Sequence, residues 1–208
     1  AQFSPLEFMK PIAAKLEIWE HTKVMKIKGN QVITQDKVLS ADKIVVATHY
    51  PVRNVPGFYF LRQHQERSYV LALSGCKRIE GMYKGIDRDG ISLRQAGEYL
   101  LLGGASHRTG KGRPGGTYIF LEKKAREYYP EGKIEMRWSA QDCMPHDGIP
   151  FIGRYSIFTP NLYVVTGFQK WGMTTSMVAA MILQGELCGE KSPYSKVFRP
   201  QRLHIRAG

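Results

Sequence analysis

The strongest constraint on the fold is a short apolar segment that leads through a glycine into a long segment with helical spacing. The first segment is Leu162–Thr166, which follows Pro160-Asn161. A short, almost uninterrupted apolar run is typical of a strand buried on both faces of a sheet. After Gly167, apolar residues recur from about Gly172 to Leu187 with the period of a helix. We therefore predict a buried strand followed by a long helix, as in layered α/β structures.

The first sixty residues carry the signals of a helix, a hairpin and another buried strand. Ser4 is a typical N-cap residue, and Pro5 suits the first position of the helix that follows. Alternating apolar residues surround Gly29-Asn30, a dipeptide that favours a two-residue hairpin turn. The segment 43–48 is a continuous apolar run, which again indicates a strand buried on both faces within a larger sheet.

The composition changes near residue 60, after a stretch at 51–57 that contains prolines and a glycine. Aromatic strand patterns then replace aliphatic ones, and we place a domain boundary there. The middle of the chain is predicted as an α+β block, with strands at 67–74, 91–95, 99–103 and 133–141 and a helix at about 119–129.

Composition excludes several classes of protein. The 208 residues are 43% hydrophobic and 23% charged, which is close to the average for globular proteins and argues against disorder. No apolar run approaches the roughly 18–20 residues of a membrane span, and no signal-peptide pattern is present, so we expect a cytoplasmic protein. The three cysteines form no CxxC or Cys/His cluster, so we expect neither a disulfide framework nor a metal site.

The net charge of +12 predicts attraction to anions, and phosphates are the natural candidates. Nucleic acid is disfavoured, because the basic residues are scattered and form no long run. The segment 100–112 superficially resembles a strand entering a phosphate-binding loop of the Walker A type. It lacks the required pattern, since Ala105 and Gly112 stand where that motif needs Gly and Ser or Thr. We interpret the part of this segment that follows the strand as a flexible basic loop, in which His107 and Arg108 are candidates to face a substrate.

The strand-turn-helix at 163–175 is the second chemical candidate. Gly167 and Gly172 bracket its turn and permit a flat ligand to approach the backbone. A helix that begins there points its unpaired N–H groups and positive dipole end at the turn, which suits developing negative charge. An ordinary structural turn is the alternative. Core packing is the simplest interpretation of the residues that share one face of the helix, Met173, Met177, Ala180 and Met181.

Several segments occur in an order that resembles FAD-dependent oxidoreductases of the D-amino-acid oxidase and glycine oxidase type. They are SPLEFMKPIAAKLEIWEHTKV from Ser4, IVVATHYP at 44–51, HDGIPFIGRY at 146–155 and LYVVTGFQKWGMTTSMVAAMI at 162–182. The segments RSYVLAL at 67–73, GGASHRTGK at 103–111 and RWSAQDCMPHDGIPFIG at 137–153 further resemble a bacterial subgroup, some members of which carry an appended Rieske domain. This chain contains no Rieske Cys-x-His pair.

The resemblance implies an α/β and α+β fold, with part of a Rossmann-like FAD-binding domain and a mixed-sheet substrate domain. It places the FAD-binding parts at 1–60 and 143–208 and the substrate domain at 61–142. The family opens with a strand and GxGxxG that hold the FAD pyrophosphate, and the first sixty residues here contain no GxGxxG, since the one match, Gly110–Gly115, lies in the middle block. We therefore expect a C-terminal fragment of a longer protein, whose missing N-terminal half is its partner, and which alone binds FAD weakly or not at all.

The resemblance also implies roles for individual residues, each of which suits an ordinary structural role as well. In the adenine and dinucleotide region these are Val24, Ala47 and Thr48, with His49 standing where related flavoproteins often have Gly. On the isoalloxazine side they are Gly153, Gly167, Lys170, Trp171, Gly172, Met173 and Thr174.

The implied activity is oxidation of an amine, amino acid or similar small donor by hydride transfer to FAD. No catalytic residue is identified, because the cofactor carries the chemistry. The candidate substrate-binding residues are Arg67, Tyr69, His107 and Arg108, since a guanidinium fork binds a carboxylate through two hydrogen bonds. The alternative is a non-catalytic α+β binding module for a protein or an anionic partner.

Overall fold

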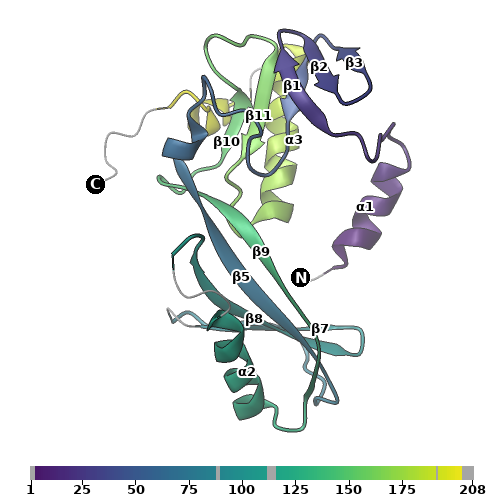
Figure 1. Ribbon diagram of the computed structural model, residues 1–208, viewed down its shortest axis with the longest axis vertical. Coiled ribbons are helices and arrows are strands. Elements are labelled where there is room, and N and C mark those ends of the chain that lie inside the picture. Colours follow the sequence, from purple (N-terminus) through teal and green to yellow (C-terminus); the bar gives the residue numbers. More distant parts are fainter. Residues whose placement is uncertain (1–2, 88–89, 112–115, 191, 203–208) are drawn as a thin grey trace. The chain divides into compact units, whose positions relative to one another are not determined.

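The computed structural model describes residues 3–87, 90–111, 116–190 and 192–202 (Figure 1). The chain divides into two compact units. The discontinuous unit comprises Phe3–His64 and Cys143–Gly208, and the inserted unit contains Gln65–Asp142. The chain passes between the units inside two long strands, β5 (Gln63–Ser74) and β9 (Lys133–Pro145). The mixed α and β fold class agrees with the sequence prediction.

The discontinuous unit begins with the predicted helix, α1 (Pro5–Ala13). The Oγ atom of Ser4 accepts a hydrogen bond of 3.4 Å from the backbone N–H of Glu7, as expected of an N-cap residue. A three-stranded antiparallel meander follows, which consists of β1 (Val24–Lys28), β2 (Gln31–Thr34) and β3 (Val38–Ser40). Gly29 occupies the first hairpin turn with φ of +58°, a conformation that glycine adopts without steric cost.

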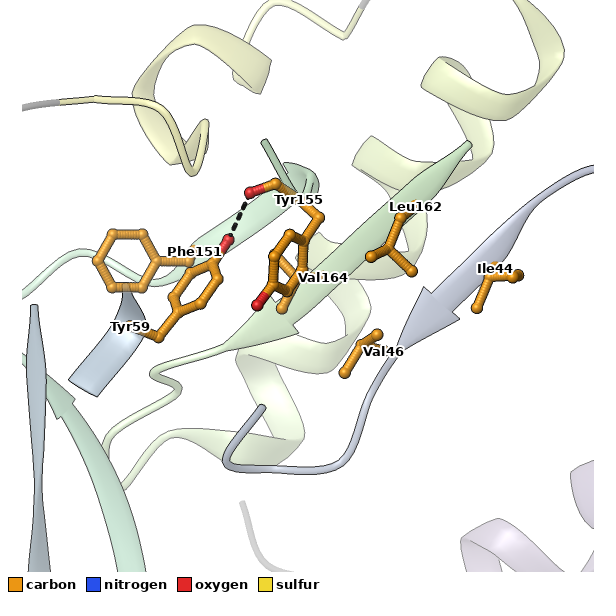
Figure 2. Packing of buried hydrophobic residues seen from close by; sticks show 7 residues of the cluster. All are labelled: Ile44, Val46, Tyr59, Phe151, Tyr155, Leu162 and Val164. Carbon is orange, nitrogen blue, oxygen red and sulfur yellow. Dashed lines mark hydrogen bonds between the residues drawn. The ribbon is translucent and has the colours of Figure 1, made fainter. Parts of the chain in front are cut away.

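A second three-stranded sheet has the order β10-β11-β4. Its strands are β4 (Ile44–Val46), β10 (Phe151–Arg154) and β11 (Leu162–Thr166). β11 lies parallel to β4 and antiparallel to β10. One face carries the cluster Ile44, Val46, Tyr59, Phe151, Tyr155, Leu162 and Val164, drawn in Figure 2. Ile27 and Val32 of the meander pack against this cluster, so the meander covers this face of the sheet.

Tyr59 belongs to a short 3-10 helix, η1 (Tyr59–Leu61), and is completely buried in this cluster. Its hydroxyl donates a hydrogen bond of 2.9 Å to the backbone oxygen of Tyr155 (Figure 2). Burial raises the pKa of Tyr59 and also raises the pKa of Tyr155 to about 12. Both phenols are therefore neutral donors at physiological pH.

The opposite face of this sheet packs against the predicted long helix, α3 (Gly172–Cys188). Ala179 and Ile182 of α3 join Ile152 of β10 in a buried cluster. The helix ends at Gly189, whose φ of +84° gives the left-handed C-cap that glycine favours. A short helix, α4 (Ser195–Phe198), follows.

The inserted unit is built on a five-stranded sheet with the order β6-β7-β8-β5-β9. Its remaining elements are β6 (Met82–Lys84), β7 (Ser92–Ala96), β8 (Tyr99–Arg108) and α2 (Gly116–Tyr128). Leu121 and Ala125 of α2 are buried against Leu71, Leu73 and Leu102 of the sheet. This unit thus closes a core of its own.

Two local predictions were wrong. The segment predicted as a basic loop is strand as far as Arg108, because β8 continues through Gly103 and Gly104 in register with β5. Of the methionines expected to lie in the core, Met177 and Met181 are on the surface, at 54% and 66% exposed, and Met173 is half-buried. No helix among the described residues combines the length and apolarity that crossing a membrane requires.

Candidate functional site

The β11–α3 turn, residues 167–171, is the centre of the candidate site. Gly167 has φ of +75°, and a Cβ atom there would lie 2.4 Å from Cγ of Pro145. Both the backbone conformation and the packing against Pro145 therefore require glycine. From the sequence we predicted that this glycine permits a ligand to approach the backbone. The structure shows that Pro145 occupies the direction in which its Cβ would point.

Hydrogen bonds within the protein hold the backbone of the turn. The N–H of Gln169 donates to the backbone oxygen of Cys143 over 3.0 Å, and that of Trp171 donates to the oxygen of Phe168 over 3.0 Å. The side-chain amide of Gln169 donates to the backbone oxygen of Gly148. Gln169 itself has a φ of +51°, which non-glycine residues keep only when their surroundings enforce it. These two backbone amides are accordingly engaged within the protein.

The end of the turn, at Trp171 and the start of α3, is open to solvent. Trp171, the N-cap residue of α3, is 69% exposed and forms no side-chain hydrogen bond to the first helical turn. Apart from its chain neighbours and the nearby backbone of α3, no atom of the described residues lies within 4 Å of the position that a Cβ would take at Gly172. The first N–H groups of an α-helix have no partner within the helix, and they carry its positive dipole end. The start of α3 is therefore suited to binding a ligand group that carries negative charge.

A largely apolar cavity of about 460 Å³ lies on the inner side of the turn, between the ends of β4 and β11 and the helix α3. Its lining residues are Val45, Ala47, His49, Val165, Thr166, Gly167, Phe168, Ser176, Ala179, Ala180 and Leu183. A smaller cavity of about 270 Å³ borders the turn at Phe168, Trp171 and Thr174. Apolar cavities of a few hundred cubic ångströms with few polar groups are the usual sites of cofactors and small ligands.

In the structure, most residues predicted to contact the isoalloxazine ring lie near one residue predicted to contact the dinucleotide, Ala47. Lys170, Trp171, Gly172, Met173 and Thr174 form the outer turn and the start of α3, and Gly167 and Ala47 line the large cavity. Thr48 follows Ala47 and donates through its hydroxyl to the backbone oxygen of Tyr50 over 2.8 Å.

His49 stands beside these residues with φ of +61°, the left-handed conformation that glycine adopts most readily. Its backbone oxygen accepts hydrogen bonds from the hydroxyl of Thr166 over 2.5 Å and from Sγ of Cys143 over 3.5 Å. The structure thus accommodates histidine at a position where the resemblance led us to expect glycine.

Two predicted cofactor residues lie elsewhere in the discontinuous unit. Val24 lines a separate cavity of about 300 Å³ with Arg53 and the start of β1. Gly153 in β10 packs toward Glu186, whose carboxylate oxygens would lie 3.2 and 3.3 Å from a Cβ there. Glu186 is fourteen residues beyond Gly172, roughly 21 Å along α3 at about 1.5 Å per residue. Burial raises the pKa of this carboxyl group.

The predicted substrate residues belong to the inserted unit, where protein contacts engage three of them. The hydroxyl of Tyr69 lies 2.9 Å from Nε2 of His107, and the two rings are stacked. Arg67 donates to Oγ of Ser139 over 2.7 Å. Tyr69 is buried, whereas Arg108, at the end of β8, is exposed. Arg67, Tyr69 and His107 therefore form one group on neighbouring strands.

Sequence reasoning gave no role to the residues that support the turn from outside it. Asp147 and Arg202 are paired, and the loop that contains Asp147 also contacts Gln169 through Gly148. The motif around Asp147 was identified only as part of a resemblance, and no local pattern links it to a residue 55 positions away. Among the residues that the structure describes, no group of three or more His, Cys, Asp or Glu side chains is placed to hold a metal ion.

Comparison with known proteins identifies the family of the chain. The model of the DAO family, FAD dependent oxidoreductase, matches residues 2–184. A protein of Bacillus subtilis strain 168 named as a Rieske 2Fe-2S iron-sulfur protein, YhfW, is 36% identical over 223 residues, which cover 100% of this chain and 44% of that relative. The chain thus spans less than half the length of the curated relative that it matches.

Solved structures with a similar fold include a glycine oxidase and an L-proline dehydrogenase. Glycine oxidase of Geobacillus kaustophilus has a TM-score of 0.73 and 16% identity, with 89% of this chain and 53% of that chain covered. L-proline dehydrogenase of P. horikoshii has a TM-score of 0.70 and 18% identity, with 93% and 57% covered. These likenesses concern the fold, and the family match covers most of the sequence. The chain belongs to the DAO family of FAD-dependent oxidoreductases.

Proposed function

We propose that this chain forms the isoalloxazine side of the FAD site in an oxidoreductase that oxidises an amine, an amino acid or a similar small donor. The observation that carries the proposal is the start of α3, which has no side-chain cap and opens to solvent beside the large apolar cavity. An apolar cavity suits a flat ring, and a helix N-terminus suits the edge of that ring on which charge develops. The residues present therefore fit a flavin.

FAD, when bound, supplies the hydride acceptor of the reaction. If FAD is bound there, the backbone N–H groups at Gly172, Met173 and Thr174 would donate hydrogen bonds to the edge of the ring that becomes anionic on reduction. A helix N-terminus stabilises such a charge by up to about 2 kcal/mol, and for a two-electron couple this amounts to roughly 40 mV in favour of the reduced form. The apolar residues of the cavity exclude water from the ring.

We assign the discontinuous unit to FAD binding and the inserted unit to the substrate. Arg67, Tyr69, His107 and Arg108 are the proposed donor-binding residues of the inserted unit. Arg108 is exposed and offers a guanidinium fork for a carboxylate. Tyr69 and His107 share a hydrogen bond, so a substrate that engages one of them changes the hydrogen bonding of the other.

Two apolar surfaces of the discontinuous unit are not covered by the described residues. They support the proposal that a further segment of the same protein packs against this chain. β4 pairs with β11 on one side only in the described sheet, and Val45 at its centre is 39% exposed. Strands in parallel sheets are usually covered on both faces. α3 is apolar around its circumference but leaves Met177 and Met181 exposed. We propose that a strand and helix of the longer protein pair with β4 and cover this face.

Calorimetry with FAD tests the proposal. The 208-residue chain alone is expected to bind FAD weakly or not at all, because the discontinuous unit contains no GxGxxG to hold the pyrophosphate. The protein expressed from its complete coding sequence is expected to purify with bound flavin. Sub-micromolar binding by the chain alone would contradict the proposed need for a further segment, and a complete protein that FAD cannot reconstitute would contradict the flavin site itself.

A further inference from the structure

A buried ion pair lies behind the β11–α3 turn and is not explained by the proposed contacts with FAD. Arg202 is 7% exposed. It donates two hydrogen bonds to Asp147, from Nε to Oδ2 over 2.7 Å and from a terminal nitrogen to Oδ1 over 3.0 Å. The guanidinium carbon also lies 4.2 Å from the centre of the Phe151 ring. Such a paired, stacked geometry is specific to arginine, because lysine has neither the fork nor the flat surface.

The same guanidinium binds the backbone of the loop 146–150 at several points. Its terminal nitrogens donate to the backbone oxygens of Ile149 and of Pro150, the latter over 3.0 Å. Asp147 in turn accepts the N–H of Ile149 through Oδ1 over 3.0 Å. Arg202 therefore fixes both the side chain and the backbone of this loop, and it does so from near the end of the described chain.

The loop is connected directly to the turn. The backbone oxygen of Gly148 accepts the side-chain amide of Gln169, which holds its left-handed conformation in the middle of the turn. Residues in this backbone region persist only when neighbouring contacts enforce it. The other contact on Gln169 is its N–H bond to Cys143 at 3.0 Å. Of these two contacts, only the one with Gly148 leads back to Arg202.

We infer that Arg202 is a positioning residue for the β11–α3 turn. Through Asp147 and the 146–150 loop it fixes Gln169, and Gln169 sets the direction in which the first N–H groups of α3 point. The role in flavin binding rests on the proposed function, whereas the effect on the turn does not. Arg202 itself makes no contact with the flavin in this proposal.

The direct test is hydrogen exchange in the 208-residue chain without FAD. Arg202→Lys keeps the charge and loses the fork, so amide exchange in the peptide that spans 167–172 is expected to accelerate about tenfold or more. Arg199→Lys is the matched control, because Arg199 is exposed and lies in the same segment, and it is expected to leave exchange unchanged. Unchanged protection of this peptide in folded Arg202→Lys would overturn the inference.

A second variant covers the case in which Arg202→Lys fails to fold, as judged by circular dichroism. Asp147→Asn retains a side-chain oxygen that accepts a hydrogen bond and loses the charge-assisted pairing. Faster exchange confined to the loop 146–150 and the turn is then expected. Uniform acceleration across all peptides would show general destabilisation and would also overturn the inference.

The effect on FAD is measured in the protein expressed from its complete coding sequence. Arg202→Lys is expected to weaken FAD binding about tenfold and to shift the flavin midpoint potential, because the helix amides no longer meet the ring in a fixed direction. Gln169→Gly removes the link to Gly148, so adding Arg202→Lys to it should change the affinity less than about twofold further. Additive effects would overturn the proposed route through Gln169. Wild-type protein without FAD would overturn the proposed function, and the exchange experiment would still decide the effect on the turn.

Discussion

The two units of this molecule differ in how completely they bury their own apolar residues. The sheet of the inserted unit and α2 enclose Leu71, Leu73 and Leu102, which are fully buried. In the discontinuous unit, α1 has no buried residue among its nine, and α3 exposes Met177. The helix of the inserted unit thus contributes to a buried core, whereas α1 of the discontinuous unit buries no residue and α3 leaves methionines exposed.

This difference bears on function, because the candidate flavin site lies in the unit with the exposed apolar surfaces. The cavity beside the turn is lined by Val45 of β4, by Ala47 just after this strand, and by Ala180 and Leu183 of α3. Small and apolar residues at such a place permit a close approach of a further backbone or of a flat ligand. The stability of the site should therefore depend on FAD and on the rest of the protein more than that of the inserted unit does.

The largest expected difference in stability is between a variant in the buried core of the inserted unit and a variant on the exposed face of α3. Leu102→Ala empties a fully buried position, so it is expected to destabilise the chain by about 2–5 kcal/mol. Met181→Ala, at a position that is 66% exposed, should change stability by no more than about 0.5 kcal/mol in the same chain. Urea unfolding of both variants measures the difference. Equal losses would show that the exposed face of α3 is packed in solution.

The two glycines that bracket the turn provide the next comparison. Gly167→Ala places a methyl group 2.4 Å from Pro145 at positive φ, so a loss of about 2–4 kcal/mol is expected. Gly172→Ala adds its methyl group in open space and should stabilise the chain by about 0.5 kcal/mol. Thermal unfolding measures both changes. In the complete protein Gly172→Ala should nevertheless weaken FAD binding, and tighter binding would contradict the placement of the ring.

The sequence predicted the elements around the turn better than it predicted their surroundings. β11 was predicted with its observed bounds and α3 to within one residue at its end, because the apolar run and the glycines are local signals. β10 was missed, since its four residues contain a glycine and follow Pro150. The pairing of Asp147 with Arg202 joins distant parts of the chain, and no periodicity reports such a contact.

The face of β4 and the methionines of α3 show a further limit of sequence reasoning. An apolar pattern reports that a surface is suited to burial, but it does not report which segment buries it. We predicted that the strand at 43–48 is buried on both faces, and the structure leaves Val45 exposed on one of them. The apolar pattern indicates that both faces of β4 are suited to burial. The described residues cover the face that carries Val45 only in part.

The exposed face of α3 is the third point of comparison, because it should behave differently in the two forms of the protein. In the protein expressed from its complete coding sequence, Met181→Ala should cost about 1–2 kcal/mol, since a covering segment would bury the methionine. Met136→Ala in the inserted unit is a matched control, because Met136 is 48% exposed and belongs to the unit with its own core. Denaturation of the complete protein measures both variants. A neutral Met181→Ala there would contradict the proposed covering segment.

The smallest expected effect is the alkaline sensitivity of the discontinuous unit. Burial raises the pKa of Tyr155 from its ordinary value of 10.0 to about 12, and also raises the pKa of Tyr59. The unfolded chain then loses these protons at lower pH than the folded chain does, so stability is maintained below pH 10.0 and falls between pH 10.0 and about 12. Tyr155→Phe cannot ionise, and it should reduce this slope even though it loses the hydrogen bond to the backbone oxygen of Arg53. Melting curves across this pH range decide the matter, and an unchanged slope in Tyr155→Phe would assign the alkaline loss to groups other than Tyr155.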